Sequence, residues 1–170
     1  MEYYCVMVKT GEEEAFKNAA EEACSALYPS SRFYSFQRKL RTNQGKYFDV
    51  PLFPGYTFFG IDELTPDFFE ILRKVKGFYR ILYDNKNPVK IAGTALEELN
   101  IFMHNGEHWG ISKVKFLPGK NIRAVSGPLV GLEGKIVAVN KKKKRVTIQS
   151  SLTPDGKRFD LLYEDVEEII

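Results

Sequence analysis

Apolar and polar positions follow two different periods along the first part of the chain. Residues 3–8 form an uncharged run of aromatic and β-branched side chains, which is typical of a buried strand. Apolar side chains then recur at helical spacing within residues 11–27, and Pro29 ends that pattern. Thr10 and Glu13 precede it at the spacing of a capping box. The pattern predicts a strand followed by a helix.

The same alternation predicts further strands and two more helices. Strand-like runs occupy 32–40, 46–50, 56–61 and 79–83. Thr65-Pro66 provides an N-cap with proline at the first helical position, and Gly77 ends that helix. A third helix begins at Thr94 and ends near Asn105. The order predicts an α+β domain in which helices cover an antiparallel sheet.

The pattern changes after residue 104. Residues 104–118 show no clear period, whereas short strands separated by glycines follow at 122–125, 135–139, 146–149 and 158–163. Strands at this spacing predict a small all-β barrel. We therefore expect a first domain at 1–105, a linker at 106–118 and a second domain at 119–170. Gly127, Gly131 and Gly134 favour the barrel, because they would be costly inside helices.

Charge is distributed unevenly along the chain. Residues 1–118 are electrically neutral, residues 119–158 hold ten basic and two acidic side chains, and residues 159–170 hold five acids. The overall net charge of +3 therefore conceals a short cationic segment. No apolar run is long enough to span a membrane, and the first residues lack the basic start of a signal peptide. We expect a cytoplasmic protein that is monomeric.

Nothing in the sequence favours catalysis, so we expect no enzymatic activity, no cofactor and no metal. Cys5 and Cys24 have the surroundings of small buried hydrophobes. His104 and His108 match the spacing of a zinc-protease motif, but Asn105-Gly106 between them favours a turn instead of the helical turn such a site needs. We expect Cys5 and Cys24 to be structural and the histidines to bind no zinc.

An aromatic segment, PLFPGYTFF at residues 51–59, is a candidate docking surface. Its two prolines make the backbone extended and stiff, and Gly55 permits a turn. Tyr56 and Phe58 would share one strand face and Phe59 the other. These aromatic side chains are either core, which we expect for Phe59, or a protein-binding patch.

These segments resemble the NusG family of transcription elongation factors. YYCVMVKTGEEE, PLFPGYTFF and VKGFYRIL are similar to the family's N-terminal domain, and GPLVGLEGKIVAV to its C-terminal KOW barrel. NGEHWGISK and GPLVGLEGKIVAVNKKKKR are similar to the LoaP-type paralogues, which are operon-specific antiterminators in the functional class that includes RfaH. The basic turn departs from that type, since the paralogues usually carry a histidine followed by Lys-Arg where this chain has only lysine and arginine. In those paralogues the KOW domain binds an RNA hairpin.

The resemblance implies partners and residues. The N-terminal domain would bind the clamp helices of RNA polymerase through Phe53, Pro54, Tyr56 and Phe58. Three cations, Lys9, Lys74 and Lys76, match regions that face the non-template DNA strand. The KOW domain would bind RNA through its cations, which are Lys120, Arg123, Lys135, Lys141, Lys142, Lys143, Lys144 and Arg145.

Other readings stay open for the basic run at 141–145. It is either a solvated hairpin end or a surface for a phosphate backbone, and the charge of +8 across residues 119–158 favours the latter. The chain could also be a general NusG-type factor, or a ribosome-associated KOW protein that meets ribosomal RNA or a ribosomal protein.

Overall fold

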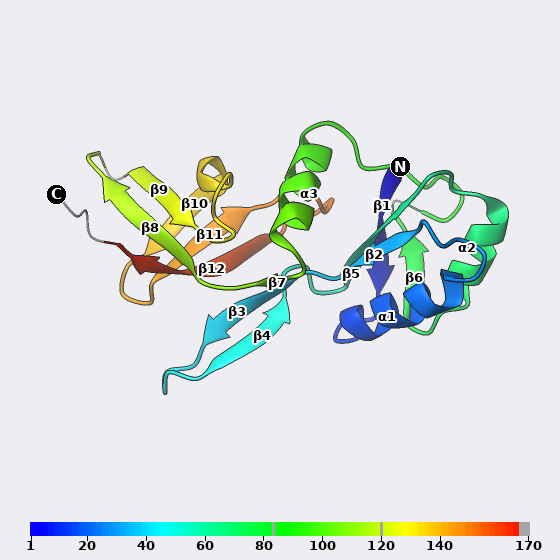
Figure 1. The fold of residues 1–170 in the computed structure, drawn as a ribbon, viewed down its shortest axis with the longest axis horizontal. Helices are drawn as coiled ribbons and strands as arrows, with labels where there is room; N and C mark the ends of the chain where they lie inside the picture. The colour runs from blue at the N-terminus through cyan, green and yellow to red at the C-terminus, as the bar shows by residue number, and fades with distance from the viewer. Residues whose placement is uncertain (83, 120, 167–170) are drawn as a thin grey trace. The chain divides into compact units, whose positions relative to one another are not determined.

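The computed structural model describes residues 1–82, 84–119 and 121–166. The chain divides into two compact units. The first contains residues 1–35 and 53–97, and the second contains residues 36–52 and 98–170. The predicted α+β class is confirmed: a sheet with helices is followed by a β-rich region. Figure 1 shows the elements of each unit.

The first unit is built on a four-stranded antiparallel sheet. The strand order is β2-β5-β1-β6. The strands are β1 (Glu2–Val8), β2 (Arg32–Tyr34), β5 (Tyr56–Ile61) and β6 (Phe78–Ile81). Helices α1 (Glu13–Cys24) and α2 (Pro66–Arg73) contribute Phe16, Phe68 and Leu72 to the core that covers one sheet face. Phe59 belongs to this core, as expected.

The two helices of the first unit begin in different ways. Thr65 caps α2, because its hydroxyl accepts a hydrogen bond from the Phe68 amide at 3.2 Å. Helix α1 starts at Glu13 and has no side-chain cap, so the predicted capping box at Thr10 is wrong. The Glu13 carboxylate is used elsewhere, since it accepts from the amides of Gly11 and Gly55.

The second unit combines a hairpin, a helix and the β-rich region. Sheet β4-β3-β7 contains β3 (Gln37–Arg41), β4 (Tyr47–Pro51) and β7 (His108–Trp109). The single strand expected at 32–40 is therefore two strands, separated at Ser35 and Phe36. Helix α3 (Gly93–Asn105) begins in the first unit and ends in the second.

Five strands form the β-rich region in the order β10-β11-β12-β8-β9. They are β8 (Ser112–Leu117), β9 (Asn121–Ser126), β10 (Ile136–Asn140), β11 (Arg145–Gln149) and β12 (Arg158–Asp165), with a 3₁₀ turn η1 (Glu133–Lys135) before β10. Side chains of β9 and β10 line one cavity of about 260 Å³, so the two edge strands face each other. This arrangement is that of a small, nearly closed barrel.

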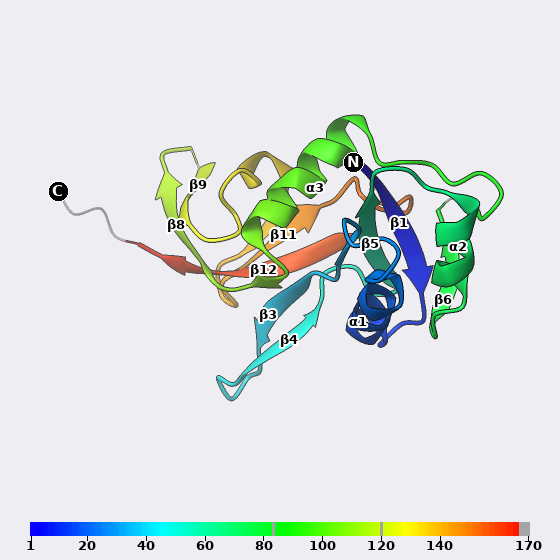
Figure 2. The same cartoon turned by 45° about the vertical axis from the view of Figure 1, so that its right-hand side comes forward.

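Four aromatic side chains join α3 and the hairpin segment to this barrel. Phe102 contacts Trp109 edge-on at 4.7 Å between centroids, and both rings contact Phe159 of β12. Phe36 packs against Phe102 at 5.8 Å. Figure 2 shows the end of α3 near β11 and β12. Residues 106–118, expected to be linker, therefore include two strands and a core tryptophan.

Candidate binding surfaces

A tight turn at Phe53–Tyr56 presents the aromatic segment. Gly55 has φ +87°, and a Cβ there would lie 3.3 Å from the Thr10 hydroxyl. Its amide donates to the Glu13 carboxylate at 2.8 Å, and its carbonyl accepts from the Val8 amide at 2.8 Å. The buried Glu13 therefore fixes this turn, a role that its place in a run of three glutamates did not reveal.

The four predicted polymerase-binding residues have unequal exposure. Phe53 and Phe58 are 2% and 1% exposed, and their rings meet edge-on at 5.5 Å. Pro54 is exposed and Tyr56 is half-buried. A partner can thus reach Pro54 and Tyr56 directly, whereas the two phenylalanines are buried.

Three cations were predicted to face DNA. Lys74 and Lys76 line an apolar groove of about 390 Å³ between α1 and α2, together with Ala19, Ala23, Glu70, Ile71 and Val75. Lys9 is exposed, and its amide donates to the Gly77 carbonyl at 2.9 Å. This hydrogen bond places the Lys9 backbone next to Gly77, the residue that follows Lys76. Its ammonium pairs with Glu12 at 3.8 Å. The three cations therefore belong to one region of the first unit.

The basic run forms the turn between β10 and β11. Asn140 holds it by accepting from the Lys143 amide at 3.0 Å, and Lys144 has φ +53°. Lys144 pairs with Asp165 at 3.1 Å, and the Lys141 ammonium lies 4.7 Å from the centre of the Phe116 ring. In contrast, the side chains of Lys142 and Lys143 are exposed and have no ion pair within the described part of the chain.

The β3–β4 hairpin adds cations to this turn. Arg41, Thr42 and Asn43 line a polar cleft of about 240 Å³ together with Lys142, Lys143, Arg145 and Leu162. Four of these side chains are cationic and none is acidic. Sequence reasoning missed Arg41, because it lies about one hundred residues before the basic run and charge was summed over residues 1–118 as a whole. That sum hides residues 23–48, which hold five basic side chains and no acid.

Two arginines fasten the hairpin to the barrel. Arg38 donates to the Asp160 carbonyl oxygen at 2.6 Å, and Arg145 donates to the Arg41 carbonyl oxygen at 3.4 Å. Burial lowers the pKa of Arg38; the Asp160 carboxylate opposes this shift, and the guanidinium of Arg145 adds to it. The Nε atoms of both arginines are buried and have no hydrogen-bond partner among the described residues.

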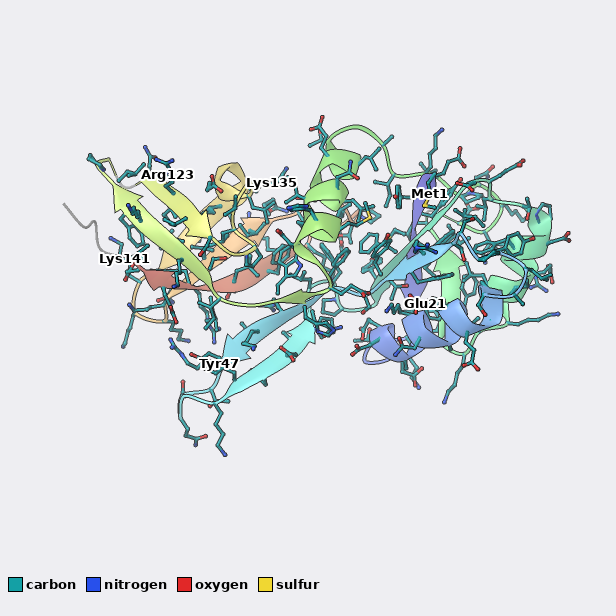
Figure 3. All side chains as sticks on the ribbon, in the orientation of Figure 1. Met1, Glu21, Tyr47, Arg123, Lys135 and Lys141 are labelled. Atoms are coloured by element: carbon teal, nitrogen blue, oxygen red, sulfur yellow. The ribbon has the colours of Figure 1, made fainter. Side chains whose placement is uncertain are left out.

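Arg123 and Lys135, two further predicted RNA-binding cations, lie outside this cleft. Arg123 is exposed on β9, while Lys135 pairs at 3.7 Å with the buried carboxylate of Glu98. In Figure 3, Arg123 and Lys135 lie on the upper side of this unit and Tyr47 of the hairpin on the lower side. Lys120 lies outside the described residues.

Other candidate sites are few in the described part of the chain. No three His, Cys, Asp or Glu side chains among those residues are placed to hold a metal ion. His104 lies in the last turn of α3 and His108 is in β7, with Gly106 at φ +82° between them. Within the described residues, every helix is too short or too polar to cross a bilayer. Cys24 is a buried thiol, and burial raises its pKa to about 11.

Comparisons with known proteins match both regions of the chain. The family model described as transcription termination factor nusG matches residues 1–100, and the KOW motif matches residues 118–149. No curated protein matches the chain. A solved structure described as "Domain interaction in Thermotoga maritima NusG" is 17% identical, with a TM-score of 0.60 over 95% of this chain and 93% of that one.

A second solved structure is the MjSpt4:Spt5 complex in its conformation B. The two chains are 17% identical, and the match covers 94% of this chain and 91% of that one, with a TM-score of 0.35. At this identity the Thermotoga maritima structure shows a shared fold.

Proposed function

Because this chain belongs to the NusG family of transcription factors, we propose that it is an elongation factor that suppresses pausing and termination. Its N-terminal domain binds RNA polymerase, and its basic KOW domain binds an RNA hairpin. We further propose that it is operon-specific, as are the LoaP-type paralogues that it resembles. The family model carries the word termination, so the antiterminating direction is our inference from that resemblance.

The observation that carries the RNA-binding part is the cationic cleft at the β10–β11 turn. Lys142 and Lys143 extend into solvent without ion pairs among the described residues, beside Arg145 and Arg41. Like charges in a cleft whose own lining holds no acid repel one another, and Asp160 lines only the adjoining cavity. A polyanion relieves that repulsion while it releases counterions. This grouping supports a phosphate-binding surface over a simple solvated turn.

The polymerase contact would be made by Pro54 and Tyr56. Both residues flank Gly55, whose turn is held by Glu13, while Phe53 and Phe58 are buried against each other. By the family resemblance, the partner is the pair of clamp helices of RNA polymerase. A factor that binds the closed clamp better than the open one shifts the population away from paused states. No cofactor and no chemical step is needed.

The groove between α1 and α2 is proposed to face the non-template DNA strand. Lys74 and Lys76 border its apolar floor, and Lys9 lies nearby. Cations beside an apolar floor suit a single strand, because they neutralise phosphates while bases contact apolar surface. We propose that the protein acts as a monomer in the cytoplasm, where transcription takes place.

A second candidate function rests on exposed valines of the KOW domain. Val125 on β9 is 50% exposed, and Val137 and Val139 on β10 are 48% and 40% exposed. Apolar side chains on facing edge strands suit a protein partner. On this candidate the chain is a general NusG-type factor or a ribosome-associated protein whose barrel recruits a protein, such as a ribosomal protein.

A salt titration of RNA binding tests the RNA-binding proposal. Changing Lys142 and Lys143 together to glutamine should reduce the log–log salt slope by about 1.4–1.8, since each phosphate contact contributes about 0.7–0.9. Lys144 is left intact because it pairs with Asp165. The control is Lys113→Gln with Lys157→Gln, which removes two charges from elsewhere in the same region and should leave the slope near that of the wild type.

Equal slopes for the wild type and the Lys142/Lys143 variant would reject RNA binding at this turn. The protein-recruiting candidate is tested in parallel by substituting Val137 with serine. Loss of a co-purifying ribosomal protein from that variant, with RNA binding unchanged, would favour the second candidate.

A further inference from the structure

The β3–β4 hairpin borders the cationic cleft. It lies outside the residues that match the KOW motif, and none of its residues was predicted to bind RNA. It contributes Arg41, Thr42 and Asn43, and its strand β3 contacts β12 of the barrel region. In Figures 1 and 2 the hairpin projects as a two-stranded arm from the end of β3 nearest β12. The cleft therefore has two walls that come from distant parts of the sequence.

Both walls are fixed to each other through backbone atoms. Arg145 binds the carbonyl oxygen of Arg41, and Arg38 binds the carbonyl oxygen of Asp160. Asp160 is held in turn by the Thr147 hydroxyl, which donates to its carboxylate at 2.7 Å. Because the Arg41 carbonyl makes the contact, the Arg41 guanidinium remains available to the cleft.

The cleft suits a phosphate group by size and charge. Its volume of about 240 Å³ is roughly that of eight water molecules in the liquid, which leaves room for a phosphodiester. Lys142, Lys143, Arg145 and Arg41 approach it from two sides. The Nε of Arg145 is buried without a hydrogen-bond partner among the described residues, so the guanidinium has an unused donor.

An aromatic ring lies next to the cleft on the hairpin. Arg41 pairs directly with Tyr47 across the two strands, so both side chains lie on one face of the hairpin. Tyr47 is 49% exposed, and the Lys39 ammonium lies 5.9 Å from its ring centre. Exposed aromatic rings beside cations are the usual stacking platforms for unpaired bases.

We propose that the β3–β4 hairpin is a second RNA-binding arm. Arg41 closes a phosphate-binding cleft against Lys142, Lys143 and Arg145, and Tyr47 stacks on an unpaired base next to that phosphate. The arm thus recognises the junction between a stem and a single-stranded flank, where a splayed base is available. This inference rests on the proposed RNA binding of the basic turn and extends it to residues 38–47.

The test uses the full chain and two labelled RNA probes, a stem–loop with an unpaired flank and the same stem–loop without it. Arg41→Gln should reduce the salt slope by about 0.7–0.9, the contribution of one phosphate. Lys46→Gln is the matched control, because it removes one charge from the same hairpin outside the cleft lining. Its slope should equal that of the wild type.

Tyr47→Ala should weaken binding of the flanked probe by about 5- to 150-fold, the range of one base–aromatic stack. It should leave the blunt probe unaffected. Thermal melting of each variant checks that the fold is retained.

The outcomes separate this inference from the proposed function. If the Lys142/Lys143 variant lowers the slope while Arg41→Gln matches Lys46→Gln, the turn binds RNA and the arm is refuted. If neither the turn nor the hairpin variants change the slope, the proposed RNA binding itself fails. Equal affinity for the DNA version of the flanked probe would overturn the assignment to RNA.

Discussion

Tyr56 is the residue at which binding and stability separate most clearly. Its ring is half-buried on β5, directly after the Gly55 turn, so truncation removes contact surface without opening the core. Tyr56→Ala should abolish co-purification with RNA polymerase while unfolding remains unchanged within about 1 kcal/mol. Retained polymerase binding by the folded variant would reject this contact.

Phe53→Ala serves as the contrasting variant. Because Phe53 is 2% exposed and packs against Phe58, its truncation leaves a cavity and should cost roughly 3–5 kcal/mol of unfolding free energy. Any loss of polymerase binding in that variant would therefore report on folding as well as on contact. Urea denaturation of both variants, measured beside the pull-down, distinguishes the two causes.

Single residues also show what local patterns can reveal. The sequence shows an aromatic segment around Gly55, with Phe53, Tyr56 and Phe58, and predicts a turn there. The structure has that turn at Phe53–Tyr56. Glu13 was not visible, because its partner Gly55 lies 42 residues away and a glutamate near a helix start reads as an ordinary capping residue.

At the scale of elements, helix α3 is connected to the barrel through Glu98. This side chain is fully buried and accepts from the Ser150 hydroxyl at 2.9 Å and the Ser151 amide at 3.1 Å. Lys135 of η1 lies 3.7 Å from its other oxygen. Lys135 therefore has a structural partner, so it is a weaker candidate for RNA binding than the exposed lysines of the basic turn.

Glu98→Gln should destabilise the protein by about 1–3 kcal/mol, because it weakens these hydrogen bonds and leaves Lys135 without its counter-charge. Glu97→Gln is the matched control at an exposed neighbouring position and should be neutral. Equilibrium urea unfolding measures both. If the two variants unfold at the same urea concentration, the Glu98 contacts do not stabilise the helix against the barrel.

Elements were predictable where one local signal sufficed. The strand at 56–61 and the helix that follows Thr65-Pro66 match the expected positions, since alternation and capping are encoded within a few residues. The break between β2 and β3 and the short β7 were missed. Their ends are set by pairing with distant strands, and β7 has only two residues from which a period could be read.

At the scale of the whole molecule, the compact units and the expected domains divide the chain differently. The expectation of separate domains at 1–105 and 119–170 came from a change in local pattern. Arg38 of the hairpin contacts Asp160, which is 122 residues further along, and no local pattern encodes such a contact. The cleft beside it could not have been predicted from the sequence for the same reason.

We propose that a fragment of residues 106–170 folds by itself, because its own strands and turns supply several buried apolar side chains, which include Val114, Leu129, Leu132, Val146 and Ile148. It should be less stable than the same region in the full chain, since Trp109 and Phe159 lose the rings of Phe36 and Phe102. Each large side chain uncovered should cost roughly 1.5–3 kcal/mol.

Dispersed amide signals together with red-shifted tryptophan emission are the expected result, with Trp109 as the only tryptophan reporter. A fragment without dispersed signals would contradict separate folding. Emission identical to that of the full chain would show that the aromatic cluster closes without α3 and the hairpin.

The interleaved order of the two units has a consequence for the protein while it is being made. Residues 36–52 leave the ribosome early, but their partners begin at residue 98. At about 5–20 residues per second, Asp160 follows Arg38 by on the order of ten seconds. The first unit has all its residues by position 97, so the nascent chain acquires its proposed polymerase-binding surface well before the proposed RNA-binding cleft can assemble.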